Sequence, residues 1–212
     1  MVAIDPAINP GSDLLLLIDI QNDFCPGGAL AVADGDAVVP VANALIDRFS
    51  HVALTQDWHP AGHSSFASSH AGAAAFSTVE TDHGAQTLWP DHCIQGTAGA
   101  AFHPDLTIDR AELVIRKGFR TELDSYSAFF ENDGRTPTGL AGYVRDRGFT
   151  RMVMAGLATD FCVAWSALDA RRLGLDVTMI LPGCRAIDQD GSLAQATRDL
   201  HAAGVVLASV VN

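Results

Sequence analysis

The sequence has 212 residues, 48% of them hydrophobic, and no linker or low-complexity run divides it. This is enough apolar material for one well-buried core, and we expect a single domain over residues 1–212. The formal net charge is -12, and the chain lacks the clustered basic residues that bind a phosphate backbone, so nucleic acid is not an expected partner.

The N-terminal segment does not have the pattern of an export signal or a membrane span. Residues 1–6 contain no basic residue, and the first apolar run, Leu14–Ile18, already ends at Asp19. The four cysteines are Cys25, Cys93, Cys162 and Cys184. They are too few and too widely spaced for the disulfide framework of a small secreted domain. We therefore expect a cytoplasmic protein with free thiols and no membrane partner.

Apolar runs alternate with segments of helical spacing along the chain. The expected strands are residues 14–18, 52–55, 113–115, 151–155, 177–181 and 205–207, and the expected helices are 38–49, 160–173 and 192–203. Residues 58–110 show no sustained periodicity and are expected to form a long functional loop. The alternation predicts a three-layer α/β/α domain whose central sheet is mainly parallel, with right-handed crossovers.

Residues that could carry chemistry follow the ends of several expected strands. Asp19, Asp57, Lys117 and the segment 156–162 each come directly after a different strand. Ligands of such sheets bind beyond the carboxyl ends of the strands. We therefore expect these residues to meet at one edge of the sheet.

A carboxylate and several imidazoles cluster after the second strand. Asp57, His59 and His63 lie in one loop segment, and His92 follows about thirty residues later. These are ligand types for one divalent metal ion, with zinc, iron and manganese all compatible. Each histidine alone could instead cap a turn, and His70 competes with His63 for the third position. The set as a whole predicts a metal site.

Cys162 is the expected nucleophile. It lies where a strand gives way to a helix, and the unpaired N–H groups there favour a thiolate and can hold an oxyanion. Asp19 would serve as an acid-base group, and Lys117 would lower the pKa of the thiol and orient the carboxylate. The alternatives are a buried structural cysteine, a turn-capping aspartate and an exposed lysine.

Six segments, taken in chain order, resemble the motifs of bacterial nicotinamidases (pyrazinamidases), which belong to the isochorismatase-like cysteine hydrolases. The segments are Asp19–Phe24, Asp57–Pro60, Trp89–Cys93, Lys117, Asp124–Phe130 and Gly156–Cys162. The similarity is collinear from about residue 14 to the last expected strand. The Asp, Lys and Cys positions indicate the superfamily, and the metal cluster narrows the resemblance to nicotinamidases.

The resemblance implies a role for each matched residue. Asp19, Lys117 and Cys162 would form the catalytic triad. The backbone N–H groups of Ala158 and Cys162 would hold the oxyanion beside a cis Leu157–Ala158 peptide bond. The metal ligands would be Asp57, His59, His63 and His92. The pyridine ring would stack in a pocket lined by Phe24, Trp89 and Tyr126.

The implied reaction is hydrolysis of nicotinamide to nicotinate and ammonia, as in NAD salvage, through a Cys162 thioester; pyrazinamide is a further expected substrate. The metal would hold the pyridine ring in place. Three alternatives stay open: a related hydrolase of another small amide or carbamoyl compound, hydrolysis by a metal-bound hydroxide with Cys162 structural, and a metal-binding protein without enzymatic activity. The sequence does not fix the oligomeric state, and a homo-oligomer is compatible with it.

Overall fold

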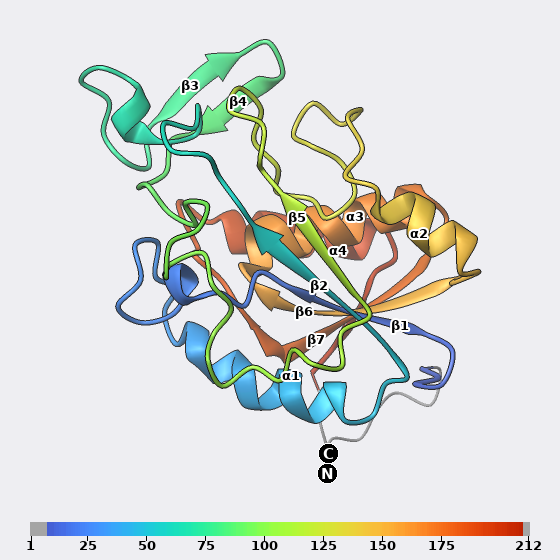
Figure 1. Cartoon of the computed structure of the whole chain (residues 1–212). Helices are drawn as coiled ribbons and strands as arrows, with labels where there is room; N and C mark the ends of the chain where they lie inside the picture. Colours follow the sequence, from blue (N-terminus) through green and yellow to red (C-terminus); the bar gives the residue numbers. More distant parts are fainter. Residues whose placement is uncertain (1–7, 210–212) are drawn as a thin grey trace.

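A six-stranded parallel sheet forms the centre of the computed structural model, which describes residues 8–209 (Figure 1). Its strands are β1 (Leu14–Ile18), β2 (His51–Asp57), β5 (Leu113–Lys117), β6 (Arg151–Leu157), β7 (Asp176–Arg185) and β8 (Val206–Ala208). The order across the sheet is β5-β2-β1-β6-β7-β8, and each neighbouring pair is parallel. The expected fold class is confirmed.

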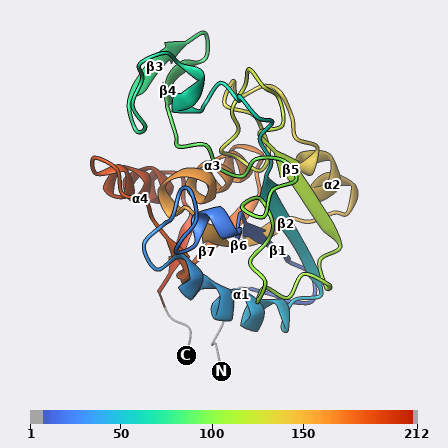
Figure 2. The same ribbon diagram turned by 60° about the vertical axis from the view of Figure 1, so that its left-hand side comes forward.

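Helices cover both faces of this sheet. They are α1 (Val38–Ile46), α2 (Leu140–Asp146), α3 (Ala164–Arg172) and α4 (Ser192–Ala202). Figures 1 and 2 show α1 on one face and the other three helices on the opposite face. The connection from β1 to β2, which contains α1, crosses the sheet in the direction opposite to the connections that contain α2, α3 and α4. Right-handed connections therefore place α1 on its own side.

The central strands are apolar along their whole length because both of their faces are covered. All five residues of β1 are buried, as are six of the seven residues in β2 and in β6. A strand buried on both sides does not alternate between polar and apolar residues. This explains why continuous apolar runs locate the middle of the sheet in the sequence.

Three features differ from the expected elements. The expected helix 160–173 is divided into a π-helical turn, Thr159–Val163, and α3. Helix α2 was not predicted because it has only seven residues, too few to establish a helical period. The loop expected over residues 58–110 contains an antiparallel hairpin of β3 (Thr78–Thr81) and β4 (Gly84–Thr87).

The hairpin projects away from the sheet (Figure 1), and most of its residues are exposed. Such a strand pair has no buried face and therefore leaves no alternating pattern in the sequence. Short 3-10 turns occur at Asn22–Phe24, Gly35–Ala37 and Ala67–Ser69.

The expectation of one domain over residues 1–212 stays a prediction, because residues 1–7 and 210–212 lie outside the described residues. Residues 1–6, which were considered as an export signal, lie outside them too. Among the described residues, no helix combines the length and apolar character needed to cross a bilayer.

Candidate active site

The carboxyl ends of four neighbouring strands bring the predicted residues together. In the register of the β2–β5 pair, Asp57 lies opposite Lys117. In the β1–β6 pair, Ile18 lies opposite Gly156, so Asp19 emerges beside the turn that leads to Cys162. The expectation that these strand ends meet at one edge is confirmed.

Strands β1 and β6 approach closely at Gly156. This residue has φ 134°, and a Cβ atom there would lie 2.1 Å from the carbonyl oxygen of Ile18. Glycine is therefore required where the chain turns from β6 toward the nucleophile.

Lys117 lies at the centre of the site. Its Nζ is 2.8 Å from Asp19 Oδ2 and 3.0 Å from Asp57 Oδ1, and it donates hydrogen bonds to the carbonyl oxygen of Ser125 (2.9 Å) and to Cys162 Sγ (3.4 Å). The side chains of Asp19 and Lys117 are fully buried, whereas Cys162 is 7% exposed. Of the three, only the thiol lines the cavity described below.

Thr55 orients the carboxylate of Asp19. Its hydroxyl donates a hydrogen bond of 2.6 Å to Asp19 Oδ1, and it accepts one from the Asp19 backbone N–H. Burial raises the pKa of Asp19 above its ordinary value, although the Lys117 ammonium opposes this shift. Burial also disfavours the charged form of Lys117, but the carboxylates of Asp19 and Asp57 outweigh burial and hold the Lys117 pKa well above its usual range.

The surroundings of Cys162 disfavour ionisation of its thiol. Burial raises its pKa well above the ordinary value, and the charges of Asp19 and Asp57 raise it further, against the effect of Lys117. The expectation that Lys117 would lower the thiol pKa agrees with the direction of its own effect, although burial raises the pKa overall. A group that takes the thiol proton during attack is therefore needed, and Asp19 is the adjacent carboxylate.

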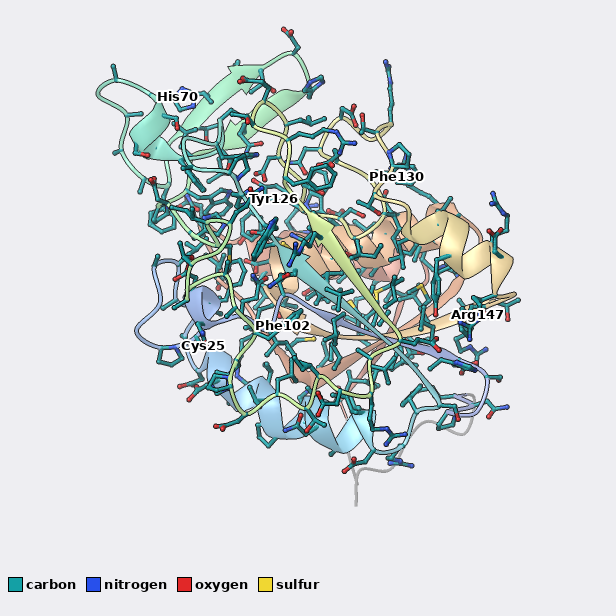
Figure 3. All side chains as sticks on the ribbon, in the orientation of Figure 1. Cys25, His70, Phe102, Tyr126, Phe130 and Arg147 are labelled. Atoms are coloured by element: carbon teal, nitrogen blue, oxygen red, sulfur yellow. The ribbon has the colours of Figure 1, made fainter. Side chains whose placement is uncertain are left out.

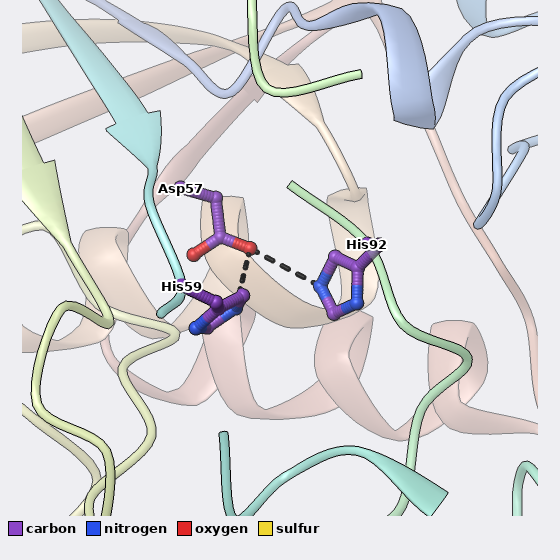
Figure 4. Close-up of side chains that lie close together, drawn as sticks. All are labelled: Asp57, His59 and His92. Carbon is purple, nitrogen blue, oxygen red and sulfur yellow. Dashed lines mark hydrogen bonds and ion pairs between the residues drawn. The ribbon is translucent and has the colours of Figure 1, made fainter. Parts of the chain in front are cut away.

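Two histidines and an aspartate face one another at the edge of the site (Figure 4). Asp57 Oδ2 lies 3.0 Å from His59 Nε2 and 3.2 Å from His92 Nε2. The Nδ1 atoms of these histidines donate to the carbonyl oxygens of Gly118 and Pro90, each at 2.8 Å. A carbonyl oxygen can only accept, so each Nδ1 carries a hydrogen. Each Nε2 faces the Asp57 carboxylate and would become a metal ligand on losing its own proton.

His63 lies in a second group of donors. Its ligand atom and those of His59 and Asp124 lie within 4.8 Å of one another. The Ser65 N–H donates to His63 Nδ1 at 3.2 Å, which leaves the hydrogen of the neutral ring on Nε2. That buried Nε2 has no hydrogen-bond partner among the described residues. Ligation through Nε2 would require the other tautomer, and the role of His63 as a ligand stays a prediction.

His70 belongs to neither donor group found within residues 8–209. Its Nε2 donates to the carbonyl oxygen of Ser64 at 2.7 Å. Figure 3 shows His70 beside the β3–β4 hairpin and Tyr126 nearer the carboxyl edge of the sheet. Between the two competing histidines, the geometry favours His63.

A cavity opens onto the thiol and the metal-ligand candidates. Its apolar wall consists of Phe24, Leu30, Trp89, Tyr126, Phe161 and Ile187. Asp57, His59, His92, Asp124 and Cys162 contribute its polar groups, and Ala158 and Ser125 also line it. The Trp89 and Phe161 rings pack edge to face at 4.9 Å, and Trp89 Nε1 donates to the Tyr126 hydroxyl at 3.1 Å. Its aromatic side chains offer ring faces and edges against which a planar ligand can pack.

The structure brings Asp19, Lys117 and Cys162 into contact, places Phe24, Trp89 and Tyr126 on the cavity wall, and contains the cis Leu157–Ala158 bond that the resemblance implies. The wall residues Leu30, Phe161 and Ile187 and the polar residue Asp124 were not predicted. Asp124 lies two residues before Tyr126 in the same motif, and that proximity was an available signal.

A thiol beside a carboxylate that can accept its proton, placed where parallel sheets bind ligands, is the arrangement of a cysteine hydrolase. Comparison of the whole chain narrows this class. Residues 13–210 match the family model described as "Isochorismatase domain", and the chain belongs to this family.

Two curated relatives are nicotinamidases. The chain is 50% identical to the nicotinamidase of Acinetobacter baylyi, over 90% of this chain and 89% of that protein. It is 47% identical to the nicotinamidase of Escherichia coli, over 91% and 92% of the two chains.

Three solved structures share the fold. The Acinetobacter baumanii nicotinamidase/pyrazinamidase has a TM-score of 0.92 and 52% identity, and the match covers 94% of this chain and 97% of that one. The PnC1 protein from L. infantum, solved in complex with nicotinate, has a TM-score of 0.82 and 39% identity over 95% and 94% of the chains. The pyrazinamidase of Pyrococcus horikoshii in complex with zinc has a TM-score of 0.76 and 31% identity over 93% and 99%.

Proposed function

We propose that this chain is an amidohydrolase that converts nicotinamide to nicotinate and ammonia. The observation that carries the proposal is the contact of Lys117 with both Asp19 and Cys162, beside a cavity for a small planar ligand. The relatives support it, since two nicotinamidases share about half of its residues over nearly the whole chain. Pyrazinamide is a further proposed substrate, supported by the two pyrazinamidases among the structural relatives.

The residues suggest an order of steps. Asp19 takes the proton of the Cys162 thiol, and the sulfur attacks the carboxamide carbon. The backbone N–H groups of Ala158 and Cys162 are proposed to hold the oxyanion. Asp19 then returns the proton to the leaving ammonia, and a water molecule that Asp19 deprotonates hydrolyses the thioester. Lys117 keeps the carboxylate oriented throughout.

The donor set fits a divalent metal ion, because Asp57, His59 and His92 converge with both Nε2 atoms free of carbonyl partners. Three protein ligands leave positions open toward the cavity that these residues line. A metal held by these residues would supply an electrophilic docking point for a ring nitrogen and would help to orient the carboxamide over the thiol. Its identity as zinc, iron or manganese, the cytoplasmic location and a homo-oligomeric state stay predictions.

Ammonia release from nicotinamide and from benzamide tests the proposal. Purified protein should hydrolyse nicotinamide, lose this activity on chelation and regain it with at least one of zinc, iron or manganese. Benzamide has no ring nitrogen and should be a poor substrate, because it lacks the group that would contact the metal. Equal turnover of benzamide would contradict the docking role, and no activity on nicotinamide in any metal form would contradict the substrate.

The same assay distinguishes the proposed function from the alternative functions. A related hydrolase of another small amide would release ammonia or a carbamoyl product from other amides but not from nicotinamide. A metal-binding protein without activity would release ammonia from none of them.

A further inference from the structure

Asp160 lies two residues before Cys162, in the π-helical turn Thr159–Val163, yet its carboxylate contacts none of the catalytic triad. It accepts hydrogen bonds from the backbone N–H of Ile187 (3.1 Å) and of Asp188 (2.8 Å). It also accepts one from the hydroxyl of Ser192 (2.5 Å). Ile187 and Asp188 belong to the segment that joins β7 to α4, and Ser192 is the first residue of α4. The Asp160 residue is only 5% exposed, so these charge-assisted bonds are protected from water.

The segment 187–191, which we call the wall segment, contains no regular secondary structure. Asp188 and Asp190 adopt left-handed backbone conformations with φ of 52° and 53°. The backbone N–H groups at its start bond to Asp160 instead of to a neighbouring strand or a helical turn. Its conformation therefore depends on the Asp160 carboxylate.

Ile187, the first residue of the wall segment, lines the substrate cavity. A second contact ties the segment to the opposite side of the site, because Gln189 Nε2 donates to the Phe76 carbonyl oxygen at 2.9 Å. The Phe76 ring packs on Trp89, with ring centroids 6.0 Å apart, and Trp89 lines the cavity too. The wall segment thus connects two cavity-lining residues, Ile187 and Trp89, that lie far apart in the sequence.

We propose that Asp160 is a positioning residue that sets the size of the ring the cavity accepts, by holding Ile187 against the nucleophile turn. The proposal rests on the proposed function, because it takes this cavity as the site of the aromatic amide. Asp160 performs no proton transfer in this account. It acts through the backbone of the wall segment on the position of one apolar side chain.

The test compares nicotinamide with nicotinamide that carries a methyl group on C5. A snug apolar pocket rejects an added methyl group by about tenfold or more in kcat/KM. Asp160→Asn keeps the shape of the side chain but replaces one accepting oxygen by an NH2 group, which cannot accept. At least one of the bonds from the Ile187 and Asp188 N–H groups is therefore lost. We expect KM for nicotinamide to rise about tenfold with kcat nearly unchanged, and the discrimination against the methylated amide to fall.

Asp188→Asn is the matched control. It removes the same charge from the wall segment itself, and asparagine tolerates the left-handed backbone. The Asp188 carboxylate accepts a bond from Leu193 N–H and does not line the cavity. Kinetic constants close to the wild-type values are expected for it. If the control lost discrimination to the same extent, the effect would belong to the charge and the proposal would be wrong.

A double-mutant cycle with Ile187→Ala shows whether Asp160 acts through Ile187. Removing the side chain directly should reduce the discrimination, and adding Asp160→Asn should then change it little further. Additive effects, or a single Asp160→Asn variant with wild-type discrimination, would overturn the proposal. Ser192→Ala, which removes one donor, should give a smaller change in the same direction and serves if Asp160→Asn does not fold.

Failure of the wild-type protein to hydrolyse nicotinamide would refute the proposed function. An active wild type with unaltered discrimination in the variants would refute only the role of Asp160.

Discussion

The ammonium group of Lys117 connects the catalytic residues with the proposed metal site. It pairs with Asp19, which faces the thiol, and with Asp57, which faces His59 and His92. Without the positive charge of Lys117, neither of these two buried carboxylates would have its negative charge balanced by the lysine. Burial raises the pKa of Asp57, but the charges of His59 and Lys117 outweigh burial and hold it well below the ordinary range. Lys117 thus pairs with one carboxylate at the thiol, Asp19, and with one at the proposed metal site, Asp57.

Thr55→Val should move the acidic limb of the pH profile to higher pH. Burial raises the pKa of Asp19, and the hydrogen bond from the Thr55 hydroxyl partly offsets that rise. Asp19 acts as a base only when ionised, so activity is lost as the pH falls through its raised pKa. Without the hydroxyl the pKa rises further. The measurement is kcat/KM for nicotinamide as a function of pH.

The matched control for this variant is Thr178→Val, another buried strand threonine, on β7. Thr55→Val is expected to lose about 1 kcal/mol of stability with its hydrogen bond, and only Thr55→Val should shift the limb. A profile of Thr55→Val identical to that of the control would show that Asp19 is not the titrating base.

Site residues could be predicted from the sequence where they follow a strand that forms a continuous apolar run. Asp19, Asp57 and Lys117 each end an apolar run, and parallel strands bring such ends to one edge. Ile187 could not be found in this way. The strand before it was expected to stop at residue 181, whereas β7 continues to Arg185 past a register shift between Met154 and Gly156. Only the three-dimensional path of the wall segment brings Ile187 to the cavity.

Among the elements, the turn that follows β5 positions the proposed metal ligands. Gly118 has φ 67°, and its carbonyl oxygen accepts the hydrogen of His59 Nδ1. A Cβ atom at this position would lie 2.5 Å from His59 Cε1 and 2.8 Å from Nδ1. The backbone therefore both orients the imidazole and leaves room for it.

Gly118→Ala should lower the affinity for zinc about tenfold or more, because the added methyl group displaces His59. Gly148→Ala is the matched control, since Gly148 has φ 73° and a Cβ atom there would meet no other atom within 4 Å. Both variants should lose about 1 kcal/mol of stability through backbone strain. Zinc affinity, measured by competition with a chelator, should fall only in Gly118→Ala; equal affinities would exclude His59 as a ligand.

The elements that the sequence did not reveal are those with no buried periodic face. The β3–β4 hairpin is mostly exposed, and α2 spans only seven residues, so neither leaves an apolar repeat. The π-helical turn at Thr159–Val163 interrupts what reads in the sequence as one helix, because its local conformation depends on the Ala158 carbonyl, which accepts from Phe161 and Val163 N–H. The six central strands, by contrast, were all predicted.

At the scale of the whole molecule, the residues proposed to bind the substrate ring and the nucleophile come from different parts of the sheet edge. The proposed metal ligands come from β2 and the loops after it, whereas the nucleophile comes from the turn after β6. The cavity joins the two, since Asp57, His59, His92 and Cys162 all line it. A substrate held at one side by its ring nitrogen would present its carboxamide to the thiol at the other side, which is catalysis by orientation.

The central claim is that nicotinamide is hydrolysed through a thioester on Cys162, and trapping that thioester tests it most directly. Wild-type protein mixed with nicotinamide and quenched in acid within one turnover should yield a nicotinoyl adduct on the peptide that contains Cys162. Cys162→Ala should show neither adduct nor ammonia release, while retaining its metal. Cys184→Ala, which removes a buried thiol outside the cavity, should remain active. Nicotinate formation without any adduct, together with an active Cys162→Ala variant, would contradict the account and favour attack by a metal-bound hydroxide.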